Sequence, residues 1–262
     1  MFDVVLPSIV AVITVASILL FERMKDKMKS LFEEREFRIL DAVLLVVSMG
    51  VMVSVIVFVP KQAIRILFLV AYCFVLFLFT FMVTEKWYVA IFPSAAFAVL
   101  YLSSFWNLFL LNAFAIVFAI LVTVYLGGLF SWKTVLVFAV LITIMDFVQV
   151  FLTGFMGNAA ETLVALELPI LIEVPTFPRG GAIRLGLGDI FLTGLLAIQT
   201  SQKYGSRGGF ISAVAVGIAF LIFEIAIFSY EFMGYFPATL VVVGGWLLGL
   251  GVQRLLQLKR AS

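Results

Sequence analysis

Long apolar segments separated by short polar breaks run through the whole chain. Nine of them lie at about residues 4–21, 40–59, 64–84, 87–105, 107–126, 133–155, 187–202, 210–230 and 235–252. A spanning helix needs roughly 20 apolar residues to cross a hydrocarbon core about 30 Å thick. Because backbone groups in lipid must be hydrogen-bonded within the segment, such runs form helices. The pattern therefore predicts an all-α polytopic membrane protein with nine transmembrane helices.

The chain is expected to form a single membrane domain. It contains no low-complexity segment and no linker, so residues 1–262 are treated as one unit. Helices 1–5 would occupy about residues 1–130, and helices 6–9 about residues 131–262. The first apolar run has neither a basic leading region nor a small-residue cleavage site, so we do not expect a removable signal peptide.

Composition supports the membrane assignment and removes several classes of function. Hydrophobic residues make up 65% of the chain and charged residues 12%, against about a quarter in soluble proteins. The net charge is +2 and no basic patch is interleaved with aromatic residues, so no nucleic-acid partner is expected. Cys73 is the single cysteine, so we expect no disulfide framework, no metal site and no other cofactor.

Histidine is absent from the chain. A serine or cysteine nucleophile normally needs an imidazole base, and zinc peptidases need histidine ligands. Rhomboid-type serine chemistry and HExxH zinc chemistry are therefore excluded.

The distribution of Lys and Arg predicts the orientation of the bundle. With nine spans, the odd-numbered loops and the C-terminus share one side, which would hold 13 of the 17 basic residues: Arg23, Lys25, Lys27, Lys29, Arg35, Arg38, Lys86, Lys133, Lys203, Arg207, Arg254, Lys259 and Arg260. The opposite side would hold only Lys61, Arg65, Arg179 and Arg184. We therefore expect the N-terminus outside, the C-terminus in the cytoplasm and the loop of about residues 156–186 outside.

Two acidic residues are predicted to lie inside the membrane, where an ionisable group is costly and usually functional. Asp146 falls near the middle of the sixth segment. Thr143, Gln149 and Thr153 recur with it at helical spacing, so this helix should have one polar face. Asp189 opens the seventh segment.

Two carboxyl groups in contact share a proton and can act as acid and base together. Peptide hydrolysis needs that combination, because one carboxylate takes a proton from water while its protonated partner donates to the carbonyl oxygen. The alternative is a transporter or channel in which the acids line a proton or cation pathway. Gly186 and Gly188 favour hydrolysis, since glycine lets another chain approach closely beside Asp189.

These residues resemble the motifs of the presenilin and signal peptide peptidase family of GxGD intramembrane aspartyl proteases. Gly186-Leu187-Gly188-Asp189 stands where that family has GxGD. Asp146 stands at the position of its sixth-span Tyr-Asp motif, and Pro237-Ala238-Thr239 stands where it has Pro-Ala-Leu. About residues 133–250 carry the match, and the nine-span layout extends it over the chain. Met145 and Thr239 depart from the family's Tyr and Leu.

The resemblance implies that Asp146 and Asp189 form the catalytic dyad. It implies that further residues shape the active site, namely Met145, Gly186, Leu187, Gly188, Pro237, Ala238 and Thr239. The predicted orientation agrees with the signal peptide peptidase branch. Substrates would then be transmembrane segments of type II membrane proteins or signal-peptide remnants, cleaved within the lipid bilayer without a cofactor. The lack of long polar tails suggests a compact prokaryotic or archaeal member in the cell membrane, and an oligomer is compatible with these features.

The loop between the two aspartates contains local structural signals. Residues 158–164 could form a short amphipathic helix. Residues 169–174 and 182–185 are β-prone and flank the turn-rich stretch 175–181, which predicts a small hairpin. Its free edge, with Ile183, Arg184 and Leu185, would pair with an unwound substrate. A disordered surface loop is the equally weighted alternative.

A prepilin or preflagellin peptidase is the nearest rival enzyme, because it also has a GxGD motif. Those enzymes usually carry a basic residue two positions after the aspartate, whereas Ile190-Phe191 follows Asp189. The glycines of the ninth segment, at positions 244, 245, 249 and 251, are expected to permit close helix packing. Glu224, deep in the eighth segment, has no assigned role.

Overall fold

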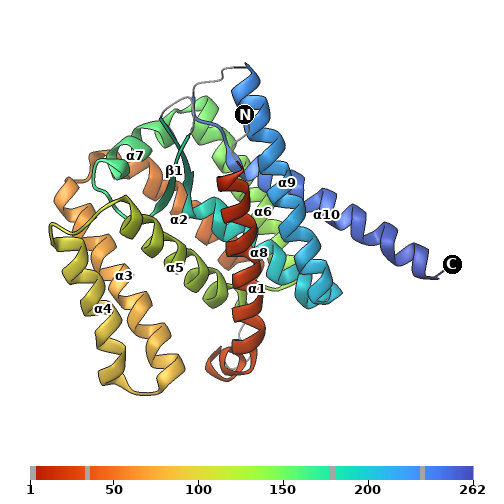
Figure 1. Ribbon diagram of the computed structural model, residues 1–262, viewed down its shortest axis with the longest axis horizontal. Helices are drawn as coiled ribbons and strands as arrows, with labels where there is room; N and C mark the ends of the chain where they lie inside the picture. Colours follow the sequence, from red (N-terminus) through yellow and green to blue (C-terminus); the bar gives the residue numbers. More distant parts are fainter. Residues whose placement is uncertain (1–3, 33–35, 177–180, 231–233, 262) are drawn as a thin grey trace.

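The computed structural model describes residues 4–32, 36–176, 181–230 and 234–261. Its helices are α1 (Val5–Phe32), α2 (Ile39–Val55), η1 (Ile56–Phe58), α3 (Lys61–Thr84), α4 (Trp87–Leu102), α5 (Leu108–Gly127), α6 (Trp132–Phe147), the π-helical turn η2 (Val148–Leu152), α7 (Phe155–Val164), α8 (Leu187–Tyr204), α9 (Ser206–Tyr230) and α10 (Ala238–Ala261). Two strands, β1 (Leu171–Pro175) and β2 (Ala182–Gly186), form an antiparallel hairpin between α7 and α8. Figure 1 shows this hairpin and α7 toward the end of the molecule at which α1 begins.

The protein is an all-α, multi-pass membrane protein apart from this hairpin. Within the described residues, seven helices are long and apolar enough to cross a bilayer: α1, α2 with η1, α3, α5, α6 with η2, α9 and α10. The expected count of nine is not confirmed at α4 and α8. Helix α4 ends at Leu102 after 16 residues, about 24 Å of helix. Helix α8 carries too many polar side chains to qualify by composition.

Helix α8 lies at the centre of the bundle. Every residue from 190 to 201 is buried, and α1, α5, α6, α9 and α10 all pack against the helix. Its polar side chains are satisfied by these neighbours. Gln199 donates to the carbonyls of Gly127 and Phe130, and Thr200 accepts a hydrogen bond from Trp246 at 2.9 Å. A polar helix is stable here because protein rather than lipid surrounds it.

The hairpin and the short helix confirm the structure expected between the two aspartates. Helix α7 contains the predicted segment 158–164, and the strands coincide with the two β-prone runs. The turn residues 177–180 lie outside the described part of the chain. The alternative of a loop without regular structure is wrong for the residues on either side of that turn.

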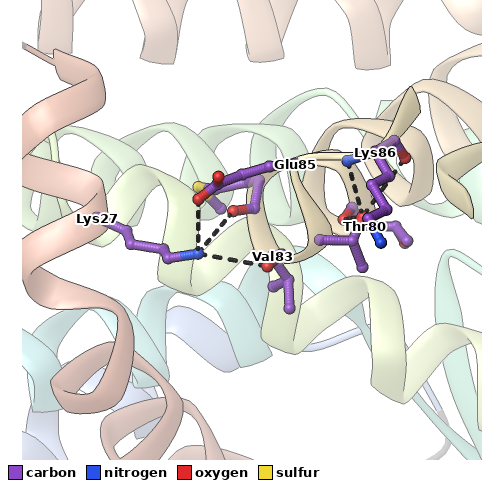
Figure 2. A network of polar contacts seen from close by, with 7 residues as sticks. Lys27, Thr80, Val83, Glu85 and Lys86 are labelled. Atoms are coloured by element: carbon purple, nitrogen blue, oxygen red, sulfur yellow. Dashed lines mark hydrogen bonds and ion pairs between the residues drawn. The ribbon is translucent and has the colours of Figure 1, made fainter.

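A lysine on the polar extension of α1 joins this helix to the α3–α4 connection. Figure 2 shows Lys27 reaching the C-terminal end of α3, where its Nζ donates to the carbonyls of Met82 and Val83 and pairs with Glu85 Oε1 at 3.4 Å. Glu85 has a left-handed backbone, with φ of 57°, and ends α3. The cation therefore lies where the last carbonyls of a helix favour positive charge.

Two of the four ninth-segment glycines make the close approach that the sequence predicts for all of them. A Cβ added at Gly245 would lie 2.9 Å from Val216 Cα, and one at Gly249 would lie 3.2 Å from Ser212 Cα, so α9 and α10 touch there. The prediction is wrong for Gly244 and Gly251, where an added Cβ would meet no atom within 4 Å. Several glycines close together in a helix do not reveal which of them will contact a neighbouring helix.

Gly244 and Gly245 provide a matched test of this contact. Gly245→Ala should lower the free energy of unfolding by about 1–3 kcal/mol, because the new methyl group overpacks the α9–α10 contact. Gly244→Ala should be neutral or stabilising by up to about 1 kcal/mol, since alanine is the better helix former. Thermal unfolding of both variants in the same detergent measures the difference. Equal stability of the two would contradict the close packing at Gly245.

Candidate functional site

Asp146 lies in the last turn of α6, immediately before η2. Its carboxyl group is held from the start of α10, where Thr239 Oγ1 donates to Asp146 Oδ2 at 2.8 Å. The backbone of Thr239 also hydrogen-bonds to this carboxyl group. The first turn of a helix has unpaired N–H groups and favours negative charge. The N-terminus of α10 therefore binds the Asp146 carboxyl group through the hydrogen-bond donors of its first turn.

The residues around Thr239 account for the way α10 begins. Pro237 is buried and precedes the helix, and Ala238 is the first helical residue and packs against the core. Proline cannot donate a backbone hydrogen bond, so it is well placed where the chain enters a helix. This arrangement brings Thr239, which is 4% exposed, to Asp146.

Asp189 lies in the first turn of α8, directly after the hairpin. Gly186 ends β2 and precedes α8 with an extended backbone, and Leu187 is buried. A Cβ at Gly186 would lie 3.4 Å from Asp189 Oδ2, while one at Gly188 would meet no atom within 4 Å. Gly186 thus keeps a side chain away from the Asp189 carboxyl group, whereas Gly188 faces open space. Neither needs a positive φ.

The two carboxyl groups are brought together by the contact between α6 and α8. Those helices pack against each other, and the Asp146 and Asp189 carboxyl groups interact electrostatically. Both residues are partly exposed although they come from the middle of the bundle. Two acids from different helices are therefore close enough to interact, and each is partly exposed.

The polar side chains expected to line α6 with Asp146 have separate partners. Thr143 and Thr153 bond to carbonyls of their own helix, at Ala139 and Gln149. The Gln149 side chain is buried and donates to the Gly50 carbonyl of α2 at 3.0 Å. These contacts stabilise the end of α6, and the π-helical turn η2 begins there. Turns of this kind are frequent at functional sites.

Met145 occupies the volume beside Gly50 of α2. A Cβ added at Gly50 would lie 2.2 Å from Met145 Sδ, so the end of this side chain rests directly on the glycine. Met145 therefore packs on a neighbouring helix as an apolar spacer. Thr239 is the hydroxyl group that reaches Asp146.

The register of the hairpin determines which backbone groups point outward. Hydrogen bonds run from Leu187 N to Ile170 O and from Thr176 N to Gly181 O. In an antiparallel pair the hydrogen-bonded residues alternate with those whose groups point away. With Glu173 opposite Arg184, the backbone groups of these two residues point away from the hairpin.

The outer edge of β1 is occupied by a side chain from α5. Asn112 Nδ2 donates to the Glu173 carbonyl at 2.8 Å, and Glu173 N donates to Asn112 Oδ1 at 2.9 Å. Farther along this edge, Pro175 has no N–H to offer. On β2, by contrast, the outward groups of Arg184 have no hydrogen-bond partner among the described residues.

The three predicted substrate-binding residues divide between two faces. Ile183 and Leu185 pack against the hydrophobic core, and their backbone groups point toward β1. Arg184 is exposed at the side chain and points its backbone outward. Its Nε pairs with Glu173 Oε2 at 2.7 Å, and this hydrogen bond raises the pKa of the guanidinium. Arg184 is thus a fixed positive charge at the open edge.

Sequence reasoning missed the residues that hold the hairpin in place. Tyr101 donates to the Leu166 carbonyl at 3.0 Å, and Trp106 donates to the Glu167 carbonyl at 3.1 Å. Together with Asn112, they tether the segment before and within β1 to the α4–α5 corner. Asn112 had a readable signal, because it is an amide within an otherwise apolar helical segment. Tyr101 and Trp106 had none, since aromatic residues are common at helix ends in membranes.

No group of three or more acidic, cysteine or histidine side chains that could hold a metal ion occurs among the described residues. Comparison with known proteins finds no matching family model and no matching curated protein.

Proposed function

We propose that the protein is an intramembrane aspartyl endopeptidase that hydrolyses peptide bonds within transmembrane segments. The main support is the placement of Asp146 and Asp189. Their carboxyl groups come from different helices and interact with each other, and Gly186 leaves the backbone beside Asp189 without a side chain. A pair of interacting acids can hold one proton and one negative charge, which is the state that activates water.

The reaction proposed here is a direct attack of water on the scissile carbonyl. The ionised carboxyl group of the pair accepts a proton from water, and the protonated one donates to the carbonyl oxygen. Collapse of the tetrahedral intermediate returns a proton to the leaving amine and gives a new carboxyl end. Because the two groups titrate as a unit, neither aspartate is assigned a fixed role.

The hairpin supports this proposal because a helix cannot be hydrolysed until its peptide bond is exposed. An extended segment of substrate would add to the free edge of β2 by backbone hydrogen bonds. Strand β2 runs through Gly186 directly into the turn that carries Asp189. A segment paired with β2 is therefore delivered toward the acids.

We further propose that α4 and α8 also cross the membrane, which restores nine spans. Helix α8 is enclosed by protein, so its polar composition carries no lipid-exposure cost. Helix α4 pairs with the full-length span α3 along its side, and a short helix is tolerated where the bilayer thins locally. Nine spans agree with the resemblance to the signal peptide peptidase branch. The proposed substrates are then type II transmembrane segments or signal-peptide remnants in the cell membrane.

The proposed orientation places the N-terminus outside and the C-terminus in the cytoplasm. It rests on the excess of Lys and Arg in the odd-numbered loops. Cysteines introduced at Val4 and Arg254, in a Cys73→Ala background, should be distinguished by a membrane-impermeant thiol reagent applied to intact cells. Labelling at position 4 alone is expected, and labelling at position 254 alone would reverse the assignment.

Asp146→Asn and Asp189→Asn should each reduce peptide cleavage by at least about a thousandfold. Loss of one residue of a catalytic unit costs almost as much activity as loss of the whole unit. An amide has nearly the shape of the acid but cannot exchange the proton. The assay is cleavage of a type II transmembrane peptide by the purified protein in detergent, with thermal unfolding as the check on folding. Asp26→Asn, on the exposed polar part of α1, is the matched control and should cleave normally. Near wild-type cleavage by either site variant would exclude the two aspartates as the catalytic pair.

Thr239 should contribute through its hydroxyl group. Thr239→Val keeps the shape but removes the donor to Asp146, and hydrogen bonds to charged groups contribute about 1.5–3 kcal/mol. We expect a decrease in kcat of roughly 10- to 100-fold, with KM little changed. Thr239→Ser retains the hydroxyl and should restore most of the activity. Equal kcat for the Val and Ser variants would show that the contact between Thr239 and Asp146 is only structural.

A further inference from the structure

The two edges of the hairpin differ because of one side chain from α5. We propose that Asn112 is a positioning residue that closes the outer edge of β1, so that a substrate strand pairs with β2 alone. This inference rests on the proposed protease function. The Asn112 side chain hydrogen-bonds to the backbone of Glu173 and would act through it rather than by contact with either carboxyl group.

The Asn112 carboxamide imitates a neighbouring strand. A residue of a neighbouring strand would offer one N–H and one C=O to the outward-facing backbone groups of Glu173. The Asn112 carboxamide offers the same donor and the same acceptor. Both contacts are shorter than 3 Å, and α5 packs along β1. Pro175 removes the donor of the next outward position on the same strand. The edge of β1 is thereby closed, because Asn112 occupies the backbone groups of Glu173 and Pro175 has no N–H to offer to a further strand.

Choice of edge matters because it sets the distance to the acids. Neighbouring strands lie about 4.8 Å apart, so a chain on the outer edge of β1 would lie about 10 Å from β2. Only β2 continues into the turn with Asp189. A substrate on the wrong edge would therefore be held in extended form but out of reach of the dyad.

Disulfide trapping distinguishes the two edges. The full-length protein, in lipid nanodiscs and with Cys73→Ala and Asp146→Asn, receives either Arg184→Cys or Glu173→Cys. These two variants are matched, because each removes the same Arg184–Glu173 ion pair. The probes are type II transmembrane peptides that carry one cysteine each at successive positions around the scissile bond. A disulfide needs Cα atoms within about 7 Å, so a strand on β2 can reach position 184 but not position 173.

With Asn112 present, we expect cross-links at position 184 and none at position 173. With Asn112→Ala, the yield at position 173 should rise and the ratio of the two yields should fall about fivefold or more, since each lost hydrogen bond is worth about that factor. In the active protein, Asn112→Ala should raise KM by a similar factor. Asn107→Ala is the control, because Asn107 caps the start of the same helix through Leu110 N without touching β1. It should lower thermal stability but leave both the ratio and KM unchanged.

Three results separate this inference from the proposed function. Cross-links at position 173 with Asn112 intact, or a ratio that Asn112→Ala leaves unchanged, would overturn the role of Asn112 while leaving proteolysis standing. An equal effect of Asn107→Ala would also overturn it, since the cause would then be α5 stability. A wild-type protein that cleaves nothing but cross-links only at position 184 would refute the protease and retain the edge assignment.

Discussion

Polar groups in the interior of a protein must find partners within the protein, and the arrangement of this molecule follows from that constraint acting on α8. This helix carries Asp189 at one end and Gln199, Thr200 and Ser201 toward the other. Five other helices enclose it, and the carbonyls of Gly127 and Phe130 and the indole of Trp246 are among its hydrogen-bond partners. The same enclosure brings α6 and the start of α10 beside Asp189. The two acids thus lie where a helix rich in polar side chains is enclosed by its neighbours.

The site is assembled from the ends of elements, where backbone groups are not used up by regular structure. Asp146 precedes a π-helical turn and accepts hydrogen bonds from the first turn of α10. Asp189 follows a strand whose outer edge is open. Met145 and Thr239, beside and opposite Asp146, have different roles. Met145 is an apolar spacer against Gly50, and Thr239 supplies a hydroxyl group to the acid.

Much of the fold could be predicted from the sequence, because apolar length alone identifies helices in a membrane. The hairpin was readable from β-prone runs on either side of turn residues. Apolar length does not decide the case of α8, because the composition of this helix does not reveal whether lipid or protein surrounds it. Gly244 and Gly245 are adjacent and identical in type, yet only the structure shows which one touches α9. The two acids stood out as charges in apolar runs, whereas the hydrogen-bond partner of Asn112 lies on a strand 61 residues away.

The central claim is that Asp146 and Asp189 act together on a peptide in extended form. Binding of a transition-state mimic, a peptide with a hydroxyethylene group in place of the scissile amide, tests it most directly. Such mimics bind about 10²-fold or more tighter than substrates when the site is built for the transition state. Calorimetry on the purified protein should give saturable binding that Asp146→Asn and Asp189→Asn each abolish. A folded wild-type protein that does not bind the mimic, or that binds it equally well without either acid, would contradict the account.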